Sequence, residues 1–231
     1  MVKKFFSKNR EQSPLKTTAV SAEPVGFEQA LKLFDELSDF KEIPFGYRET
    51  GCQERATVMS DLLVRSGYTP MRAWIFNVKA HMNLTTPGGE DLSWWYHTAP
   101  ALKVRLSKGQ DTELIFDPSM YDGPVTFQEW CKPIISTAPE AVELYLTAYN
   151  KVTTKMHCTE LRVVKGRQWQ KELESARDEL QDYINIQKDS PVFKSSLKRI
   201  FNDIARKRIL SEDLIITSPN GQIKKKVKYE I

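Results

Sequence analysis

The chain has 231 residues, of which 40% are hydrophobic, 28% charged and 10% aromatic. These proportions are typical of a soluble globular protein with one substantial core, and they exclude an intrinsically disordered chain. The formal net charge of +4 is too small to indicate nucleic-acid binding by itself, so we expect no nucleic-acid partner.

The cysteine and histidine content limits the kinds of site to expect. Three cysteines, Cys52, Cys131 and Cys158, are an odd and low number that argues against a disulfide framework. No Cys-x-x-Cys pair is present and the histidines number only three, so we expect no structural zinc site and no other cofactor.

The N-terminal residues and the hydropathy pattern bear on localisation. No apolar run approaches the ~20 residues that a membrane-spanning helix needs, and the basic first ten residues lack the apolar segment of a secretory signal peptide. We therefore expect a cytoplasmic protein, or one exported without a Sec-type signal, for instance into a host or competitor cell.

The first part of the chain contains a tail and a helix. Residues 1–24 are polar and show no periodicity, so we predict a disordered tail. Between Phe27 and Phe40 the apolar residues recur at helical spacing, which predicts a helix that packs on the core.

A second helix is predicted to begin near Cys52. Thr50, followed three residues later by Gln53, has the pattern of a capping box, and Gly67 is the predicted residue just beyond the helix end. Because Cys52 then lies in the first turn, the helix dipole and the unpaired N–H groups favour its thiolate form. The same N–H groups can stabilise an oxyanion on a substrate.

Three stretches downstream of this helix have the composition of strands. Residues 71–79 are rich in aromatic and β-branched side chains, residues 94–106 alternate well enough for one or two strands, and residues 108–111 predict a hairpin turn into a strand that ends at Phe116. Together they predict an α+β fold, in which an antiparallel sheet packs on the helix that carries Cys52.

Helical patterns dominate the C-terminal half. Thr126 and Glu129 form a second capping-box pattern. Periodicity predicts further helices over residues 138–150, 169–184 and 192–204. Residues 218–221, Ser-Pro-Asn-Gly, predict the turn of a terminal β-hairpin.

We therefore divide the chain into a catalytic domain over residues 25–158 and a mainly helical C-terminal extension, or small domain, over residues 159–231. This last segment carries 16 Lys and Arg against 11 Asp and Glu, with the densest run at residues 224–228. A lysine-rich edge strand exposed to water explains that run. A surface that binds an acidic protein, a phosphoinositide or a nucleic acid is the alternative.

Cys52 is the candidate nucleophile, and it needs a base and a group that orients the base. His97, on a predicted strand, and Asp117, which closes another, are the candidates. Each residue also has a purely structural interpretation: a small buried thiol at a helix start, a hydrogen-bonded core histidine, and a turn former before Pro118.

Several motifs around these three residues occur in an order and spacing found in a known family. They are Ile43-Pro44-Phe45, Gly51-Cys52-x-x-Arg55-Ala56, Gly67-Tyr68, Trp94-x-Tyr96-His97-x-Ala99, Asp117-Pro118-Ser119 and Gly123-Pro124-Val125-Thr126. On these motifs, residues 43 to about 130 resemble the bacterial protein-glutaminase (protein-glutamine deamidase) family.

The resemblance implies a papain- and transglutaminase-like fold and a Cys-His-Asp triad. Cys52 would be the nucleophile, His97 the acid and base, and Asp117 the group that orients His97. The substrate-binding or oxyanion residues would be drawn from Gln53, Trp94, Trp95 and Tyr96. The reaction would convert a glutamine of a protein substrate to glutamate with release of ammonia, through a thioester.

Since no blocking pro-segment is visible, we expect an inhibitor or chaperone partner, and a bacterial effector or toxin is one such setting. Two other functions stay open. A transglutaminase or a cysteine protease would use the same three residues, and a non-catalytic binding module would act through the basic C-terminal part.

Overall fold

The computed structural model describes residues 23–77, 81–85, 91–106, 109–135, 142–153, 161–189, 214–217 and 223–227. Most of the predicted N-terminal tail, the helix predicted over 192–204 and the turn predicted over 218–221 lie outside these ranges. The described residues form an α+β fold, as the sequence predicts.

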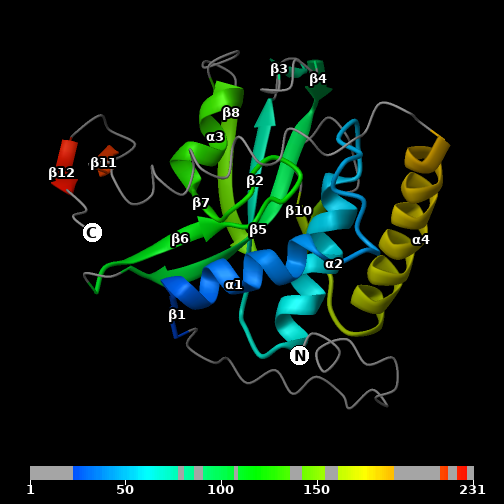
Figure 1. Cartoon of the computed structure of the whole chain (residues 1–231), viewed down its shortest axis with the longest axis horizontal. Coiled ribbons are helices and arrows are strands. Elements are labelled where there is room, and N and C mark those ends of the chain that lie inside the picture. Colours follow the sequence, from blue (N-terminus) through cyan, green and yellow to red (C-terminus); the bar gives the residue numbers. More distant parts are fainter. Residues whose placement is uncertain are drawn as a thin grey trace.

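The described residues form four helices and twelve strands, and Figure 1 shows how they are arranged. The helices are α1 (Phe27–Ser38), α2 (Cys52–Arg65), α3 (Phe127–Ile135) and α4 (Arg167–Asp189). The strands are β1 (Val25–Gly26), β2 (Met71–Asn77), β3 (Met82–Thr85), β4 (Asp91–Trp94), β5 (Tyr96–Arg105), β6 (Asp111–Ile115), β7 (Val125–Thr126), β8 (Val142–Ala148), β9 (Lys151–Thr153), β10 (Leu161–Val163), β11 (Leu214–Thr217) and β12 (Ile223–Val227).

The main sheet has the strand order β7-β6-β5-β2-β8, and the short strand β1 adds to the end of β5. All the pairs are antiparallel except β1 with β5, which is parallel. Three separate antiparallel pairs, β3–β4, β9–β10 and β11–β12, complete the strands. The last pair consists of the two strands predicted to form the terminal hairpin.

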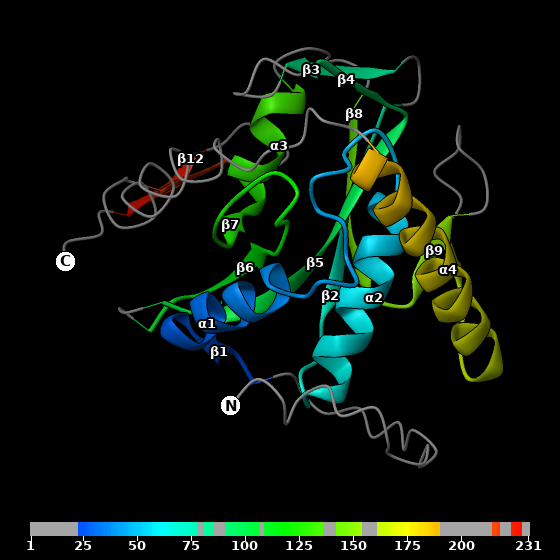
Figure 2. The same ribbon diagram turned by 45° about the vertical axis from the view of Figure 1, so that its right-hand side comes forward.

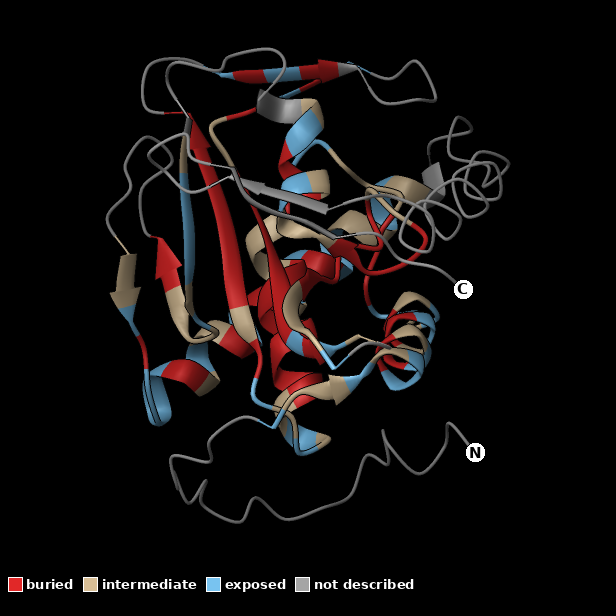
Figure 3. Cartoon of the chain, turned by 90° about the vertical axis from the view of Figure 1, so that its left-hand side faces the viewer, coloured by how far each residue is buried: buried red, intermediate tan, exposed pale blue. Residues whose placement is uncertain are grey.

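The two faces of the sheet are covered by different elements, because side chains alternate between the faces along each strand. One face packs on α1, α2 and α4 through Leu102, Val104 and Leu114. The other carries Ala73 and Ile75 and is covered by α3 and the β3–β4 hairpin. Figures 1 and 2 show α4 beside α2, and Figure 3 shows buried residues concentrated along α2 and the central strands.

Several predicted helix and turn signals are confirmed. Helix α2 ends in a Schellman motif: Gly67, at φ +89°, donates its N–H to the carbonyl of Val64, and Tyr68 donates to Leu63. At the start of α3, Thr126 N–H donates to the Glu129 carboxylate while Glu129 N–H donates to the Thr126 hydroxyl, which is a complete capping box.

The helix predicted over residues 138–150 is wrong, because residues 142–148 form strand β8 on the edge of the main sheet. The apolar residues there fit either a helical or a strand period. The strand is formed because the buried strand β2 needs a partner along its second edge. Every residue of β2 pairs with β8, from Met71 with Ala148 to Asn77 with Val142. A non-local partner of this kind overrides local periodicity.

Helix α4 packs on the same core as α1 and α2. Its residues Leu173, Ala176 and Leu180 are buried in that cluster, so the first helix of the 159–231 segment closes one side of the core. The division of the chain at residue 159 stays a prediction. Within the described ranges, no helix has both the length and the hydropathy that crossing a membrane requires.

Candidate active site

Cys52 is the first residue of α2, and Gly51 is the residue that caps the helix, with φ +82°. The predicted capping box of Thr50 and Gln53 is therefore wrong: no side chain caps α2. Because Gly51 occupies the N-cap position, Thr50 lies one residue too early for its hydroxyl to cap the helix. The Gln53 side-chain oxygen instead accepts a hydrogen bond from the N–H of Thr153, at 2.8 Å.

His97 and Asp117 come together because they lie on neighbouring strands. His97 is the second residue of β5, and Asp117 follows β6 by two residues. The antiparallel register, which pairs Ala101 with Ile115, brings the two side chains into contact. His97 Nε2 donates a hydrogen bond to Asp117 Oδ2 at 2.6 Å, and both residues are buried.

Two further side chains bind the Asp117 carboxylate. The Ser119 hydroxyl donates to Oδ1, and Trp130 Nε1 donates to Oδ2 at 2.9 Å. Burial by itself would raise the pKa of Asp117, but the charge and hydrogen bond of His97, with the bonds from Ser119 and Trp130, lower it to about 2. Asp117 is therefore a carboxylate at neutral pH.

Two indole rings stack on the imidazole of His97. Trp94 stacks on it at 4.6 Å between centroids and 15° between planes, and Trp130 stacks at 5.4 Å and 28°. Trp94 is itself held by a hydrogen bond from its Nε1 to the carbonyl of Arg48, at 2.9 Å. The two rings leave His97 little freedom to turn away from Asp117.

Cys52 is half-buried, and its Sγ lies 3.9 Å from the main-chain oxygen of Tyr96, the residue before His97. Burial disfavours the charged form of His97. The charge and hydrogen bond of Asp117, aided by a hydrogen bond and charge from Cys52, outweigh burial and raise the pKa of His97 to about 9. At neutral pH the ring is therefore an imidazolium beside the Cys52 sulfur.

Arg55, one turn into α2, is buried beside the nucleophile and had no predicted role beyond its place in the motif. Its Nη1 donates to the main-chain carbonyls of Tyr47, at 2.7 Å, and Thr50, at 2.9 Å. Burial lowers the pKa of Arg55. Several neighbouring charges oppose this effect, and the interaction with Cys52 opposes it most strongly. A buried guanidinium therefore lies near the sulfur of Cys52.

The three aromatic residues predicted to line the site lie in different surroundings. Trp94 is buried against His97, whereas Trp95 is half-buried with its ring 4.1 Å from that of His81. Tyr96 points to the other side of the sheet, where it packs against Trp74 and Phe76. Substrate contact by these residues and by Gln53 stays a prediction.

The Cys131 thiol differs from that of Cys52. Cys131 is buried, and burial raises its pKa to about 12, so it stays protonated. Among the residues that the structure describes, no group of three or more His, Cys, Asp or Glu side chains is arranged to hold a metal ion.

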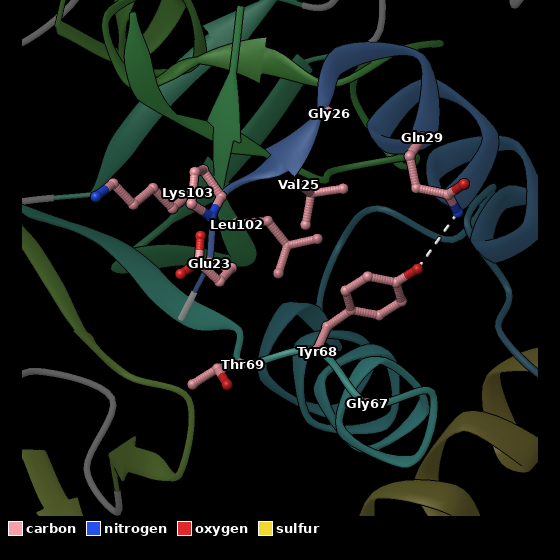
Figure 4. A pocket seen from close by; sticks show the side chains of 10 residues that line it. Glu23, Val25, Gly26, Gln29, Gly67, Tyr68, Thr69, Leu102 and Lys103 are labelled. Carbon is pink, nitrogen blue, oxygen red and sulfur yellow. Dashed lines mark hydrogen bonds between the residues drawn. The ribbon is translucent and has the colours of Figure 1, made fainter. Parts of the chain in front are cut away.

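One described cavity lies far from this chemistry. It has a volume of about 370 Å³ and is lined by β1, the start of α1, the loop after α2 and the far end of β5 (Figure 4). Gln29 donates to the hydroxyl of Tyr68 at 3.3 Å across it. Gly67 and Cys52 mark opposite ends of the 14-residue helix α2, which puts the cavity about 20 Å from the thiol.

Comparison with known families and structures gives consistent results. Residues 30–134 match the model of a family described as "Glutaminase", while no curated protein sequence matches the chain. The solved structures that match include a crystal structure of protein-glutaminase, with a TM-score of 0.54 and 19% identity over 68% of this chain and 88% of the other.

A crystal structure of pro-protein-glutaminase matches with a TM-score of 0.59 and 18% identity, over 85% of this chain and 70% of the other. The NMR structure of protein-glutaminase from Chryseobacterium proteolyticum matches with a TM-score of 0.55 and 19% identity, over 76% of this chain and 97% of the other. At these identities the likeness establishes a shared fold.

Proposed function

Since residues 30–134 match the model of the glutaminase family, we propose that this chain is a protein-glutamine deamidase, which hydrolyses the side-chain amide of glutamine in a protein substrate to glutamate and ammonia. The observation that carries the proposal is the buried, hydrogen-bonded pair of His97 and Asp117 beside a thiol at a helix N-terminus. Cys52, His97 and Asp117 are the proposed triad.

In the first step, the Cys52 thiolate attacks the side-chain carbonyl carbon of the glutamine. The carbon–sulfur bond forms, and the tetrahedral intermediate collapses with cleavage of the carbon–nitrogen bond. The His97 imidazolium gives its proton to the departing nitrogen, which leaves as ammonia. The raised pKa of His97, about 9, keeps that proton available at neutral pH.

In the second step, neutral His97 takes a proton from water, and the resulting hydroxide attacks the thioester carbon. The carbon–sulfur bond breaks, the thiolate of Cys52 is restored and glutamate is released. Asp117 stabilises the imidazolium in both steps through its hydrogen bond to Nε2. Nδ1 is therefore the ring nitrogen that faces Cys52 and exchanges protons with the substrate nitrogen and water.

The start of α2 supplies the charge stabilisation that such an intermediate requires. The first N–H groups of a helix have no partner within the helix, and here they belong to Cys52 and its neighbour Gln53. We propose these main-chain N–H groups as donors to the oxyanion. This role uses the main chain of Gln53, because its side-chain oxygen is bound to Thr153.

The direct test incubates the protein with an N-terminally blocked glutaminyl peptide and with an unfolded protein, and follows ammonia and a mass gain of about one unit for each glutamine converted. We expect Cys52→Ala to abolish both signals and Cys131→Ala to retain them. Undiminished ammonia release by Cys52→Ala would exclude Cys52 as the nucleophile.

The same assay separates the related reactions. With a primary amine present, covalent incorporation of the amine in preference to water would indicate a transglutaminase. Cleavage of the substrate backbone would indicate a cysteine protease. Neither product is expected here, because residues 30–134 match the model of the glutaminase family.

A further inference from the structure

Gly51 is in contact with the aromatic ring of Tyr183, which lies on α4, far along the chain. A Cβ atom at Gly51 would lie 2.7 Å from Tyr183 Cε2 and 3.0 Å from Cδ2. The ring therefore fills the space beside the residue that caps α2 and precedes Cys52. The contact joins a helix beyond the family match to the start of the helix that carries the thiol.

The same ring also stacks on Tyr47, with the centroids 4.8 Å apart and the planes at 22°. Tyr47 and Thr50 are in turn bound on their carbonyl oxygens by Arg55. The segment 47–51, which leads into the nucleophile, is thus held by both Arg55 and Tyr183.

The position of this ring is fixed by the packing of α4. Leu173, Ala176 and Leu180 occupy the core between α4 and α2, and Tyr183 follows Leu180 by three residues on the same face. The Tyr183 ring is half-buried against that cluster. Ordering of α4 on the core therefore carries the ring to Gly51.

We propose that Tyr183 is a positioning residue for the nucleophile, and that its ring holds segment 47–51 so that Cys52 faces His97. The C-terminal segment thereby completes the active site. The inference rests on the proposed role of Cys52 as nucleophile. It assigns no contact between Tyr183 and the reacting atoms.

The test compares the full-length variants Tyr183→Ala and Tyr183→Phe with wild type. The rate of alkylation of Cys52 by iodoacetamide, followed by mass spectrometry of the peptide that contains it, measures the nucleophile without any substrate. The second measurement is kcat and KM for the blocked glutaminyl peptide. We expect Tyr183→Ala to lower kcat by about 10-fold or more with little change in KM, because small displacements of a reacting group are costly.

Alkylation of Cys52 in Tyr183→Ala should slow as well and lose the pH profile of wild type, whereas Tyr183→Phe should restore both measurements. Leu33→Ala is the matched control, since it removes a buried side chain of the same core cluster from α1 and not from α4, which carries Tyr183. It should lower Tm while Cys52 alkylation, measured well below Tm, stays close to wild type.

Wild-type alkylation and kcat in Tyr183→Ala would overturn the inference. Losses in Tyr183→Ala that Leu33→Ala reproduces would also overturn it, because they would reduce the role of Tyr183 to general core packing. Absence of ammonia release by wild type would instead overturn the proposed function, and the alkylation rates would then decide the positioning role alone.

Discussion

Asp117 binds His97 through Nε2 at 2.6 Å, in a setting where both side chains are buried. This bond leaves Nδ1 as the ring nitrogen that can exchange a proton with Cys52. The Trp94 and Trp130 rings stack on the imidazole, and this packing supports the ring orientation that the hydrogen bond to Asp117 sets.

The first prediction concerns the pH dependence of deamidation. Because the pKa of His97 is raised to about 9, the imidazolium that protonates ammonia is present below that pH and is lost above it. We expect kcat/KM to be flat through neutral pH and to fall as the pH rises through about 9. A profile that falls with a midpoint near the ordinary histidine value of about 6.5 would contradict this assignment.

The stability of the folded protein should also depend on the protonation of His97. A histidine whose pKa is higher in the folded state contributes stability that is complete below about 6.5, its unfolded value, and is lost as the pH rises through about 9. We expect the free energy of unfolding, measured with urea, to decline across that interval.

The second prediction concerns Asp117→Asn, which keeps the shape of the side chain and removes the charge that raises the pKa of His97. We expect kcat to fall by roughly 10²-fold or more and the alkaline limb of kcat/KM to move to lower pH. The decline of stability between pH 6.5 and 9 should become shallower in this variant. An unmoved alkaline limb would show that Asp117 does not control the titration of His97.

Sequence patterns were sufficient for the parts of the site whose signals are local. A helix start at Cys52, a strand at His97 and the end of a strand at Asp117 all follow from residue types within a few positions. Neighbouring antiparallel strands joined by the hairpin near Gly109 then bring His97 and Asp117 together.

The contacts that the sequence did not predict are those between distant segments. Trp130 reaches Asp117 from α3, and Tyr183 reaches Gly51 from α4, and no local pattern marks either residue as part of a site. Strand β8 was mistaken for a helix for the same physical reason, since its pairing with β2 spans about 70 residues of sequence. The cap of α2 was misassigned because the left-handed conformation of Gly51 is set by its tertiary surroundings.

The third prediction separates the two roles of Trp130. Trp130→Phe keeps a ring next to His97 and removes the N–H that donates to Asp117. A hydrogen bond to a charged group contributes about 1.5–3 kcal/mol, so we expect a clear fall in kcat with a modest fall in Tm. Trp130→Ala also removes a fully buried ring and should cost about 3–5 kcal/mol of stability. Wild-type kcat in Trp130→Phe would show that the bond has no part in the reaction.

The fourth prediction uses Gly51→Ala, which adds a methyl group against Tyr183 and forces alanine into a left-handed conformation. The conformational part alone costs about 1–2 kcal/mol, and the clash adds to it. We expect lower stability in urea and slower alkylation of Cys52. Because Tyr183→Ala removes the clash and leaves the backbone strain, the double variant should lose less stability than the sum of the two single variants. Additive losses would argue against contact between these residues in solution.

The fifth prediction concerns the side chain of Gln53, which lies next to the nucleophile but binds the N–H of Thr153 at 2.8 Å. If this side chain has only a structural role, Gln53→Ala should remove one part-buried hydrogen bond and lower the free energy of unfolding by about 1 kcal/mol. The main-chain N–H proposed to bind the oxyanion survives the substitution, so kcat should change little when measured well below Tm. A direct substrate contact predicts the reverse, a large rise in KM or fall in kcat with unchanged stability. Urea unfolding and steady-state deamidation of the glutaminyl peptide, measured on the same preparation, distinguish the two outcomes.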